Sequence, residues 1–263
     1  LGQKVNFLKN HGPKLEPIFS VDKLNYKRIN NCLNKISNVF ETVQILKSKQ
    51  QKQKIIGFCG GPFTVLNYMV EGGTSKKHEK IKSFILNKRE KANEIIEVLI
   101  ELSLEYIKKQ VDSGADYIQI FESWAGLLDN EDYDDFIIKP NKIISDEMKV
   151  YSKKVKIIHF PRGSKQNYVN FVKSVYCDVI SVDEEFPNEL LKIAKTKGIT
   201  IQGNLNPLTL VEGGIKMKEN VISVLEKFKE NDHIFNLSHG IVPQTNLSHV
   251  EETINIVRKY NGT

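Results

Sequence analysis

The chain has 263 residues, of which 40% are hydrophobic and 9% aromatic, an ordinary supply for a globular protein of one large domain. A fold of this size removes about 70–75% of the unfolded chain's surface from water, which excludes disorder for the bulk of the chain. The net charge is +6, but Arg28, Arg89, Arg162 and Arg258 are the only arginines, and the lysines are mixed with acidic residues. This pattern indicates a solvated surface rather than a nucleic-acid-binding stripe, and leaves a polyanionic small molecule open as a partner.

The longest stretch without a charged residue, Ile55 to Val70, is shorter than the about 20 residues that span a bilayer, so we expect no transmembrane helix. The sequence also shows no basic-plus-apolar leader. Its three cysteines, Cys32, Cys59 and Cys177, make neither a disulfide framework nor a CxxC metal site, and we expect a cytoplasmic protein. Because the chain begins with Leu1 rather than Met, we expect its natural start to lie elsewhere.

Residues 1–27 show no strong element, and Arg28–Lys47 is the first helical pattern. Lys91–Asp112 carries a broad apolar helical stripe, and Gly114 follows it as a C-terminal cap. A last helix is predicted over Ser248–Tyr260, with Ser248 as its N-cap. The predicted strands are mostly apolar runs, typical of strands buried on both faces of a parallel sheet. They are Lys54–Phe58, Asp116–Phe121, Val155–Phe160, Asp178–Val182, Thr200–Gln202 and His233–Leu237.

The alternation of strands and helices predicts an α/β fold with a parallel sheet, and no linker or composition shift divides the chain, so we expect one domain over residues 1–263. The phosphate fingerprints that favour an open doubly wound sheet are missing from the sequence. Polar residues instead follow many of the predicted strands, as at the C-terminal mouth of a (β/α)8 barrel. These positions are Gly60-Gly61-Pro62, Glu122-Ser123, Arg162-Gly163, Asp183, Asn204 and Ser238-His239-Gly240.

Several of these residues are candidates for a site. Gly60-Gly61-Pro62 either lets a ligand approach the backbone or forms a tight strand-to-helix turn. Tyr68, two helical turns on, is either a hydroxyl donor to a ligand or a core residue. Ser123 lacks an adjacent base, so it is either a donor to a substrate carboxylate or a turn residue. His239, between small residues after the last strand, suits a proton donor or a carboxylate or metal ligand. We interpret His159 as a buried strand histidine.

Four segments of the sequence, in order, closely resemble uroporphyrinogen decarboxylase. They are Gly57-Phe58-Cys59-Gly60-Gly61-Pro62-Phe63-Thr64 with Tyr68-Met69-Val70-Glu71-Gly72-Gly73, then Phe121-Glu122-Ser123-Trp124-Ala125-Gly126, then Gln202-Gly203-Asn204-Leu205-Asn206-Pro207, and finally Asn236-Leu237-Ser238-His239-Gly240-Ile241 with Pro243 and Thr245. The resemblance implies a (β/α)8 barrel and a homodimeric, cofactor-free and metal-free carboxy-lyase of porphyrin and haem biosynthesis. Such an enzyme converts the four acetate side chains of uroporphyrinogen III to methyl groups, giving coproporphyrinogen III and carbon dioxide.

The resemblance also implies roles for individual residues. Tyr68 resembles the family tyrosine that hydrogen-bonds in the catalytic pocket, Ser123 resembles the hydroxyl that contacts a substrate carboxylate, and His239 resembles the histidine that binds a propionate. The sequence departs from the family at Glu184, where the family often has Trp, and at Asn206, where it commonly has Asp.

The larger departure lies at the front of the chain. The family's arginine-rich segment, reading like Arg-Gln-Ala-Gly-Arg-Tyr, and its Phe-Ser-Asp strand end with the cation-stabilising aspartate have no counterpart in residues 1–53. We therefore expect a single barrel domain without its N-terminal part, with about six of the eight strand–helix units, and inactive as the isolated polypeptide.

Two rival functions remain open. One is a non-catalytic remnant that binds a tetrapyrrole or a partner without turnover. The other is a zinc-dependent corrinoid methyltransferase on the same fold, in which a His-x-Cys at a strand end holds the metal. The nearest candidate here reads His159-Phe160-Pro161 and lacks the cysteine, which disfavours this rival.

Overall fold

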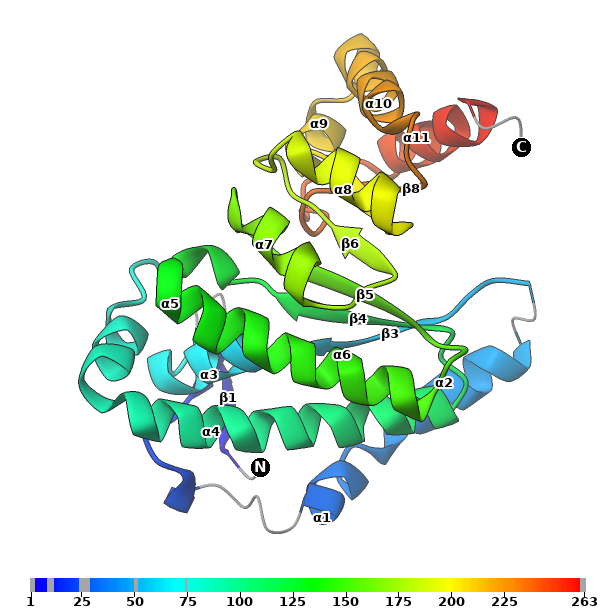
Figure 1. Ribbon diagram of the computed structural model, residues 1–263. Coiled ribbons are helices and arrows are strands. Elements are labelled where there is room, and N and C mark those ends of the chain that lie inside the picture. Colours follow the sequence, from blue (N-terminus) through cyan, green and yellow to red (C-terminus); the bar gives the residue numbers. More distant parts are fainter. Residues whose placement is uncertain (1–2, 9–11, 24–28, 50–51, 74, 261–263) are drawn as a thin grey trace. The chain divides into compact units, whose positions relative to one another are not determined.

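Six parallel strands and the helices between them carry the fold in the computed structural model, which describes residues 3–8, 12–23, 29–49, 52–73 and 75–260 (Figure 1). The start of the predicted helix at Arg28 lies outside the described residues. Two compact units make up the chain, Leu1–Ile157 and Ile158–Thr263. Among the described helices, none is both long and apolar enough to cross a membrane.

All six predicted strands are confirmed, with bounds that shift by up to three residues. They are β3 (Ile56–Gly60), β4 (Tyr117–Glu122), β5 (Lys156–Pro161), β6 (Val179–Ser181), β7 (Thr200–Leu205) and β8 (His233–Leu237). In the first unit β3 pairs with β4, and in the second unit the pairing runs β5, β6, β7, β8. Every one of these pairings is parallel, as expected for an α/β fold.

Burial on both faces, however, holds only for part of the sheet. The side chains of β5, β6 and β7 are buried almost throughout, and β6 has paired neighbours on both sides. Strands β3 and β8 instead alternate between covered and exposed positions. The prediction of full burial is therefore wrong for these two strands, because an apolar run does not show which of its faces finds a packing partner.

The first unit packs its helices around a long central one. Its helices are α1 (Ile29–Asn34), α2 (Ser37–Lys49), α3 (Pro62–Glu71), α4 (Glu79–Asp112), α5 (Asn130–Tyr133) and α6 (Lys139–Tyr151), with a π-helical turn over Asp134–Ile138 between the last two. The single helix predicted over Arg28–Lys47 is thus two helices. Helix α4 begins earlier than predicted and is kinked at Lys88, and Gly114 follows its C-cap residue with a φ of 109° that glycine adopts readily.

Helix α4 is joined to β3 by one buried amide. Gln110 accepts a hydrogen bond from Phe58 N at 3.0 Å and donates one to Phe58 O at 3.1 Å, as a neighbouring strand would do. A Cβ atom at Gly57 would lie 2.6 Å from the Gln110 Oε1 atom, so the position requires glycine. The amide thus fixes how deeply α4 packs on this strand.

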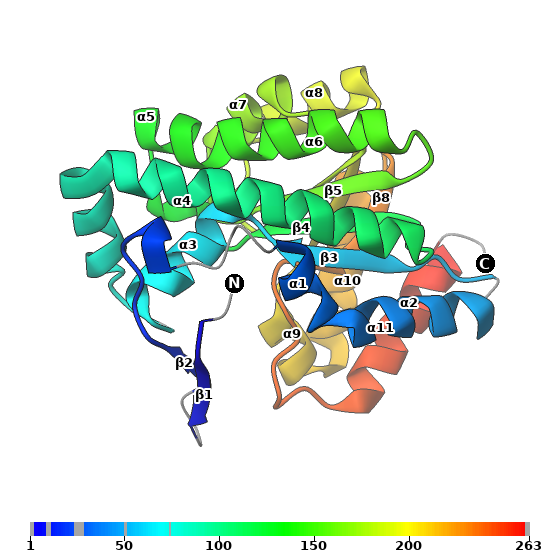
Figure 2. The ribbon, with the colours of Figure 1, turned by 90° about the horizontal axis from the view of Figure 1, so that it is seen from below.

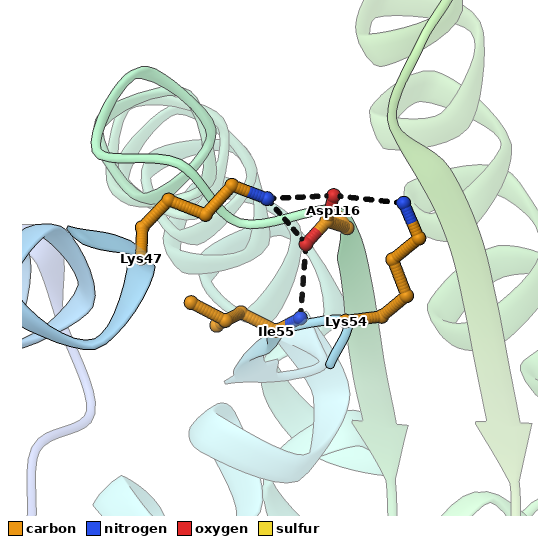
Figure 3. A network of polar contacts seen from close by, with 4 residues as sticks. All are labelled: Lys47, Lys54, Ile55 and Asp116. Carbon is orange, nitrogen blue, oxygen red and sulfur yellow. Dashed lines mark hydrogen bonds and ion pairs between the residues drawn. The ribbon is translucent and has the colours of Figure 1, made fainter. Parts of the chain in front are cut away.

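Asp116 anchors the segment that leads into β3 (Figure 3). Its carboxylate accepts hydrogen bonds from Lys47 Nζ at 2.8 Å, from Ile55 N at 3.0 Å and from Lys54 Nζ at 3.5 Å. Desolvation tends to raise the pKa of Asp116, but the hydrogen bonds from Lys47 and Ile55 outweigh it and lower the pKa overall. Helix α2 is in this way tied to the start of β4.

The first residues form an antiparallel hairpin that the sequence did not predict. Strand β1 (Val5–Leu8) pairs with β2 (Gly12–Leu15), and a single 3-10 turn follows at Val21–Lys23 (Figure 2). Leu15 N donates to Gly72 O at 2.9 Å and Ile18 N donates to Met69 O at 3.0 Å. These contacts attach the hairpin to the end of α3. The hairpin was not predicted because its strands have only four residues each and its attachment depends on distant residues.

The second unit carries α7 (Asn167–Ser174), α8 (Glu189–Lys197), α9 (Pro207–Glu212), α10 (Gly214–Phe228) and α11 (Leu247–Tyr260). Its core includes Leu205, Leu210, Met217, Val221 and Leu225, packed against apolar side chains of β8 and α11. The predicted last helix is confirmed, but its predicted N-cap is wrong. Asn246 precedes α11, and its side-chain oxygen accepts hydrogen bonds from both Ser248 N and Ser248 Oγ.

Candidate active site

A buried carboxylate, Glu122, lies at the carboxyl end of β4 in the first unit. It accepts hydrogen bonds from Phe63 N, Thr64 N, Thr64 Oγ1 and Asn141 Nδ2, at distances of 2.9 to 3.3 Å. Burial raises the pKa of Glu122 to about 7, although these donors favour the ionised form and oppose the rise. Two of the donors are free N–H groups in the first turn of α3, so the carboxylate caps that helix.

The Gly60-Gly61-Pro62 turn serves this contact. A Cβ atom on Gly61 would lie 2.2 Å from Glu122 Cδ, and Pro62 occupies the first helical position of α3. The space in front of Gly61 is therefore filled by the chain's own carboxylate. Of the two interpretations left open, the tight strand-to-helix turn is the one that this geometry supports.

Tyr68 and Ser123 are both neighbours of Trp124, the only tryptophan in the sequence. Tyr68 is half-buried on α3, and its ring meets the Trp124 ring edge to face at 6.4 Å between centroids. Ser123 is half-buried directly after β4 and directly before Trp124. The structure thus brings these two predicted residues to one end of β4, both partly open to solvent, which a hydroxyl group needs in order to reach a ligand.

Two aromatic side chains beside them were missed as candidates in the sequence. Phe58 is 60% exposed on β3, and its ring meets the Phe121 ring of β4 edge to face at 6.1 Å. Phe121 is half-buried, and the exposed ring of Phe58 offers an apolar surface against which a flat ring can pack. The signal in the sequence was aromatic residues inside the recognised motifs, but we interpreted them only as strand core.

His239 lies in the second unit, exposed to solvent, in the segment that follows β8. Its neighbour Ser238 is buried and doubly held, because Ser238 N donates to Leu205 O at 2.8 Å and Ser238 Oγ donates to Glu184 Oε1 at 2.9 Å. The start of the loop is thereby fixed to β7 and to the loop after β6, while the His239 side chain stays free to meet a ligand.

The two departures from the family pattern contact each other in the second unit. Asn206 Nδ2 donates to Glu184 Oε2 at 3.0 Å. An aspartate at position 206 would have no N–H to donate and would place a second negative charge beside Glu184. The two departures are therefore compatible as a pair, and together with Ser238 they connect the ends of β6, β7 and β8.

Two other polar residues of the predicted barrel mouth, Asp183 and Asn204, form hydrogen bonds within the second unit. Asp183 accepts a hydrogen bond from Gly163 N, and Asn204 Nδ2 donates to Asp183 O at 2.7 Å. His159 is buried, with its ring 5.2 Å from Phe171, and burial lowers its pKa to about 3, as we expected for a core histidine. Within the described part of the chain, no group of three His, Cys, Asp or Glu side chains is placed to hold a metal ion.

Solved structures show the class of fold. A methyltransferase from Methanosarcina mazei matches with a TM-score of 0.77 at 18% identity, over 99% of this chain and 76% of that one. A B12-independent methionine synthase from Shewanella sp. W3-18-1 matches with a TM-score of 0.57 at 12% identity, over 98% and 75%. The chain therefore has the α/β, TIM-barrel-like fold of these proteins, with six parallel strands of its own.

The chain belongs to the uroporphyrinogen decarboxylase family, whose model, described as uroporphyrinogen decarboxylase (URO-D), matches residues 1–260. It is 38% identical to a protein of that name from Orientia tsutsugamushi (strain Ikeda), over 100% of this chain and 77% of the relative. It is 35% identical to the one from Rickettsia bellii (strain RML369-C), over 99% and 76%. The resemblance seen in four motifs thus extends over nearly all of the chain.

Proposed function

We propose that the chain is the substrate-binding part of a uroporphyrinogen decarboxylase, an enzyme that removes the four acetate carboxyl groups of uroporphyrinogen III as carbon dioxide without a cofactor. The observation that supports this most directly is the grouping in the first unit. Two hydroxyl side chains, Tyr68 of α3 and Ser123 at the end of β4, lie next to Trp124, and the exposed ring of Phe58 on β3 contacts the half-buried ring of Phe121 on β4. Such a surface suits a polycarboxylate substrate built of pyrrole rings, because aromatic side chains pack on pyrrole carbons and hydroxyls donate to carboxylates.

The reaction itself sets the requirements of the site. Loss of carbon dioxide from a pyrrole acetate leaves an electron pair on carbon, so the pyrrole is first protonated on a ring carbon and then accepts that pair. The site must donate a proton, stabilise the ring cation and hold the other carboxylates. In our proposal Tyr68 hydrogen-bonds in the catalytic pocket, Ser123 donates to an acetate, and His239 of the second unit binds a propionate.

The family's arginine segment and cation-stabilising aspartate have no counterpart among residues 1–53, so we propose that the 263-residue polypeptide binds the substrate without turning it over at a normal rate. A homodimer in the cytoplasm completes the proposal. The family resemblance implies the homodimer, which sedimentation of the purified chain tests, and the proposed cytoplasmic location rests on the cysteine pattern of the sequence.

Direct binding tests the proposal independently of turnover. Trp124 is the only tryptophan and lies beside both hydroxyls, so we expect uroporphyrinogen III to quench its fluorescence. Replacing Ser123 by Ala or His239 by Ala removes one hydrogen bond to a charged group, and each should weaken binding about tenfold. Ser248→Ala, a change in the first turn of α11, serves as the control and should bind as the wild type does.

The outcomes separate the alternatives. Binding that both site variants weaken supports the proposal, and coproporphyrinogen formed at a normal rate would refute the expectation of inactivity. Equal affinity of the wild type and both site variants, or no quenching by uroporphyrinogen, would overturn the proposed site.

A further inference from the structure

His78 is a buried residue of the first unit that contacts Trp124, and neither the sequence motifs nor the proposed function uses it. It is 3% exposed, and its ring lies 4.3 Å from the Trp124 ring between centroids. Trp124 in turn meets the Tyr68 ring at 6.4 Å. Three aromatic rings thus follow one another from a buried histidine to a candidate substrate-binding tyrosine.

The imidazole is held on its other side by a buried amide. His78 Nδ1 lies 3.0 Å from Asn67 Oδ1, and Asn67 is 1% exposed on α3, one residue before Tyr68. An amide oxygen only accepts hydrogen bonds, so Nδ1 carries the proton and donates. Burial lowers the pKa of His78, which agrees with a neutral imidazole in this contact.

The backbone of His78 shows that its side chain matters. The residue precedes α4 with φ of 53° and ψ of 39°, the left-handed region, where a residue other than glycine costs about 1 kcal/mol. Glycine at this position would avoid that cost. A buried histidine persists there because its side-chain contacts with Trp124 and Asn67 compensate for the strain.

The orientation of the Trp124 indole depends on contacts with neighbouring side chains. Among the described residues, its indole N–H is buried and has no hydrogen-bond acceptor. A buried donor left unpaired costs about 1–3 kcal/mol, so hydrogen bonding of its own does not hold the indole in this orientation. Ring contacts with His78 and with Tyr68 do so instead.

We propose that His78 is a positioning residue: its imidazole, fixed by Asn67, holds the Trp124 indole against Tyr68 and so keeps the Tyr68 ring in place for substrate. This inference rests on the proposed function, because it assigns His78 to the same site. His78 acts through Trp124 and does not touch the substrate.

Two variants of His78 separate positioning from general stability. His78→Gly removes the ring but relieves the left-handed backbone, so it should keep a folded unit while weakening uroporphyrinogen binding about tenfold. His78→Phe keeps a ring against Trp124 but cannot donate to Asn67, so it should recover only part of the affinity that His78→Gly loses. Val98→Ala, which removes buried methyl groups elsewhere on α4, is the control and should lower stability without changing affinity.

The fluorescence of Trp124 gives a readout that needs no ligand. In His78→Gly the indole should become more accessible to acrylamide, with its emission shifted to longer wavelength, and His78→Phe should reverse both changes in part. If the wild type binds no uroporphyrinogen, the proposed function fails, and acrylamide quenching alone then decides whether His78 holds Trp124. Unchanged quenching in His78→Gly, or an affinity loss in Val98→Ala equal to that in His78→Gly, would overturn the positioning role.

Discussion

The two units bury ionisable groups of opposite kind. In the first unit Glu122 is buried with four hydrogen-bond donors, and burial raises its pKa from 4.5 to about 7. In the second unit His159 is buried with its ring 5.2 Å from the Phe171 ring, and burial lowers its pKa from 6.5 to about 3. Both shifts favour the uncharged form, yet they give the two units opposite responses to pH.

The direction follows from proton linkage. A carboxyl whose folded pKa is raised contributes stability that is present below about pH 4.5 and is lost as the pH rises through 7. A histidine whose folded pKa is lowered contributes stability that is present above about pH 6.5 and is lost as the pH falls through 3. We therefore expect the first unit to tolerate acid better than the second.

The largest expected effect concerns His159. Between pH 6.5 and about pH 3, the lowered pKa of His159 corresponds to about 5 kcal/mol of stability that the wild type loses on acidification. His159→Leu takes up no proton when it unfolds and should lack this part of the pH dependence, whatever its stability at neutral pH. Urea unfolding at several pH values between 3 and 7, followed by circular dichroism, measures the difference. If the free energy of unfolding changed equally with pH in the wild type and the variant, His159 would not cause the acid sensitivity of the second unit.

Glu122 should give the opposite slope with a somewhat smaller size, about 3 kcal/mol between pH 4.5 and 7. Glu122→Gln stays neutral at every pH, although its amide nitrogen would face some of the four donors that the carboxylate accepts, a cost that does not change with pH. Relative to this variant, the wild type should lose stability as the pH rises. Trp124 emission during urea unfolding follows the first unit. A wild type that gains stability with pH relative to the variant would contradict the raised pKa.

Gly61→Ala tests whether the turn is shaped by the carboxylate. The added Cβ atom would lie 2.2 Å from Glu122 Cδ, and overpacking of this kind costs about 2–3 kcal/mol. Gly240→Ala is the matched control, because a Cβ atom there has nothing within 4 Å. The thermal midpoint should fall in the first variant and stay unchanged in the second. An unchanged thermal midpoint in Gly61→Ala would mean that Glu122 can move away from the turn without a loss of stability.

The smallest effect is expected at Asp116. Its carboxylate is 17% exposed and bonds Lys47, Lys54 and Ile55, so Asp116→Asn should cost about 1 kcal/mol at pH 7 and low salt. Since the pKa of Asp116 is lowered, the loss should vanish as the pH falls below the ordinary carboxyl range. Lys54→Met, at a side chain 68% exposed, should change little. A larger effect of Lys54→Met than of Asp116→Asn would contradict this order.

The sequence by itself determined the order and type of the six parallel strands, the α/β class and the family. Apolar runs, helical stripes and four recognisable motifs are local features, and a few neighbouring residues suffice to set them. The candidate residues Tyr68, Ser123 and His239 were identified in the same way.

Only the tertiary structure decided which groups meet. Glu122 and Thr64 are 58 residues apart, and nothing near Gly61 in the chain shows that a carboxylate fills the space before it. The exposure of Phe58, the attachment of the β1–β2 hairpin to α3 and the contact of His78 with Trp124 are likewise long-range. Burial and pairing depend on what distant segments place beside a residue, and that information is absent from any local pattern.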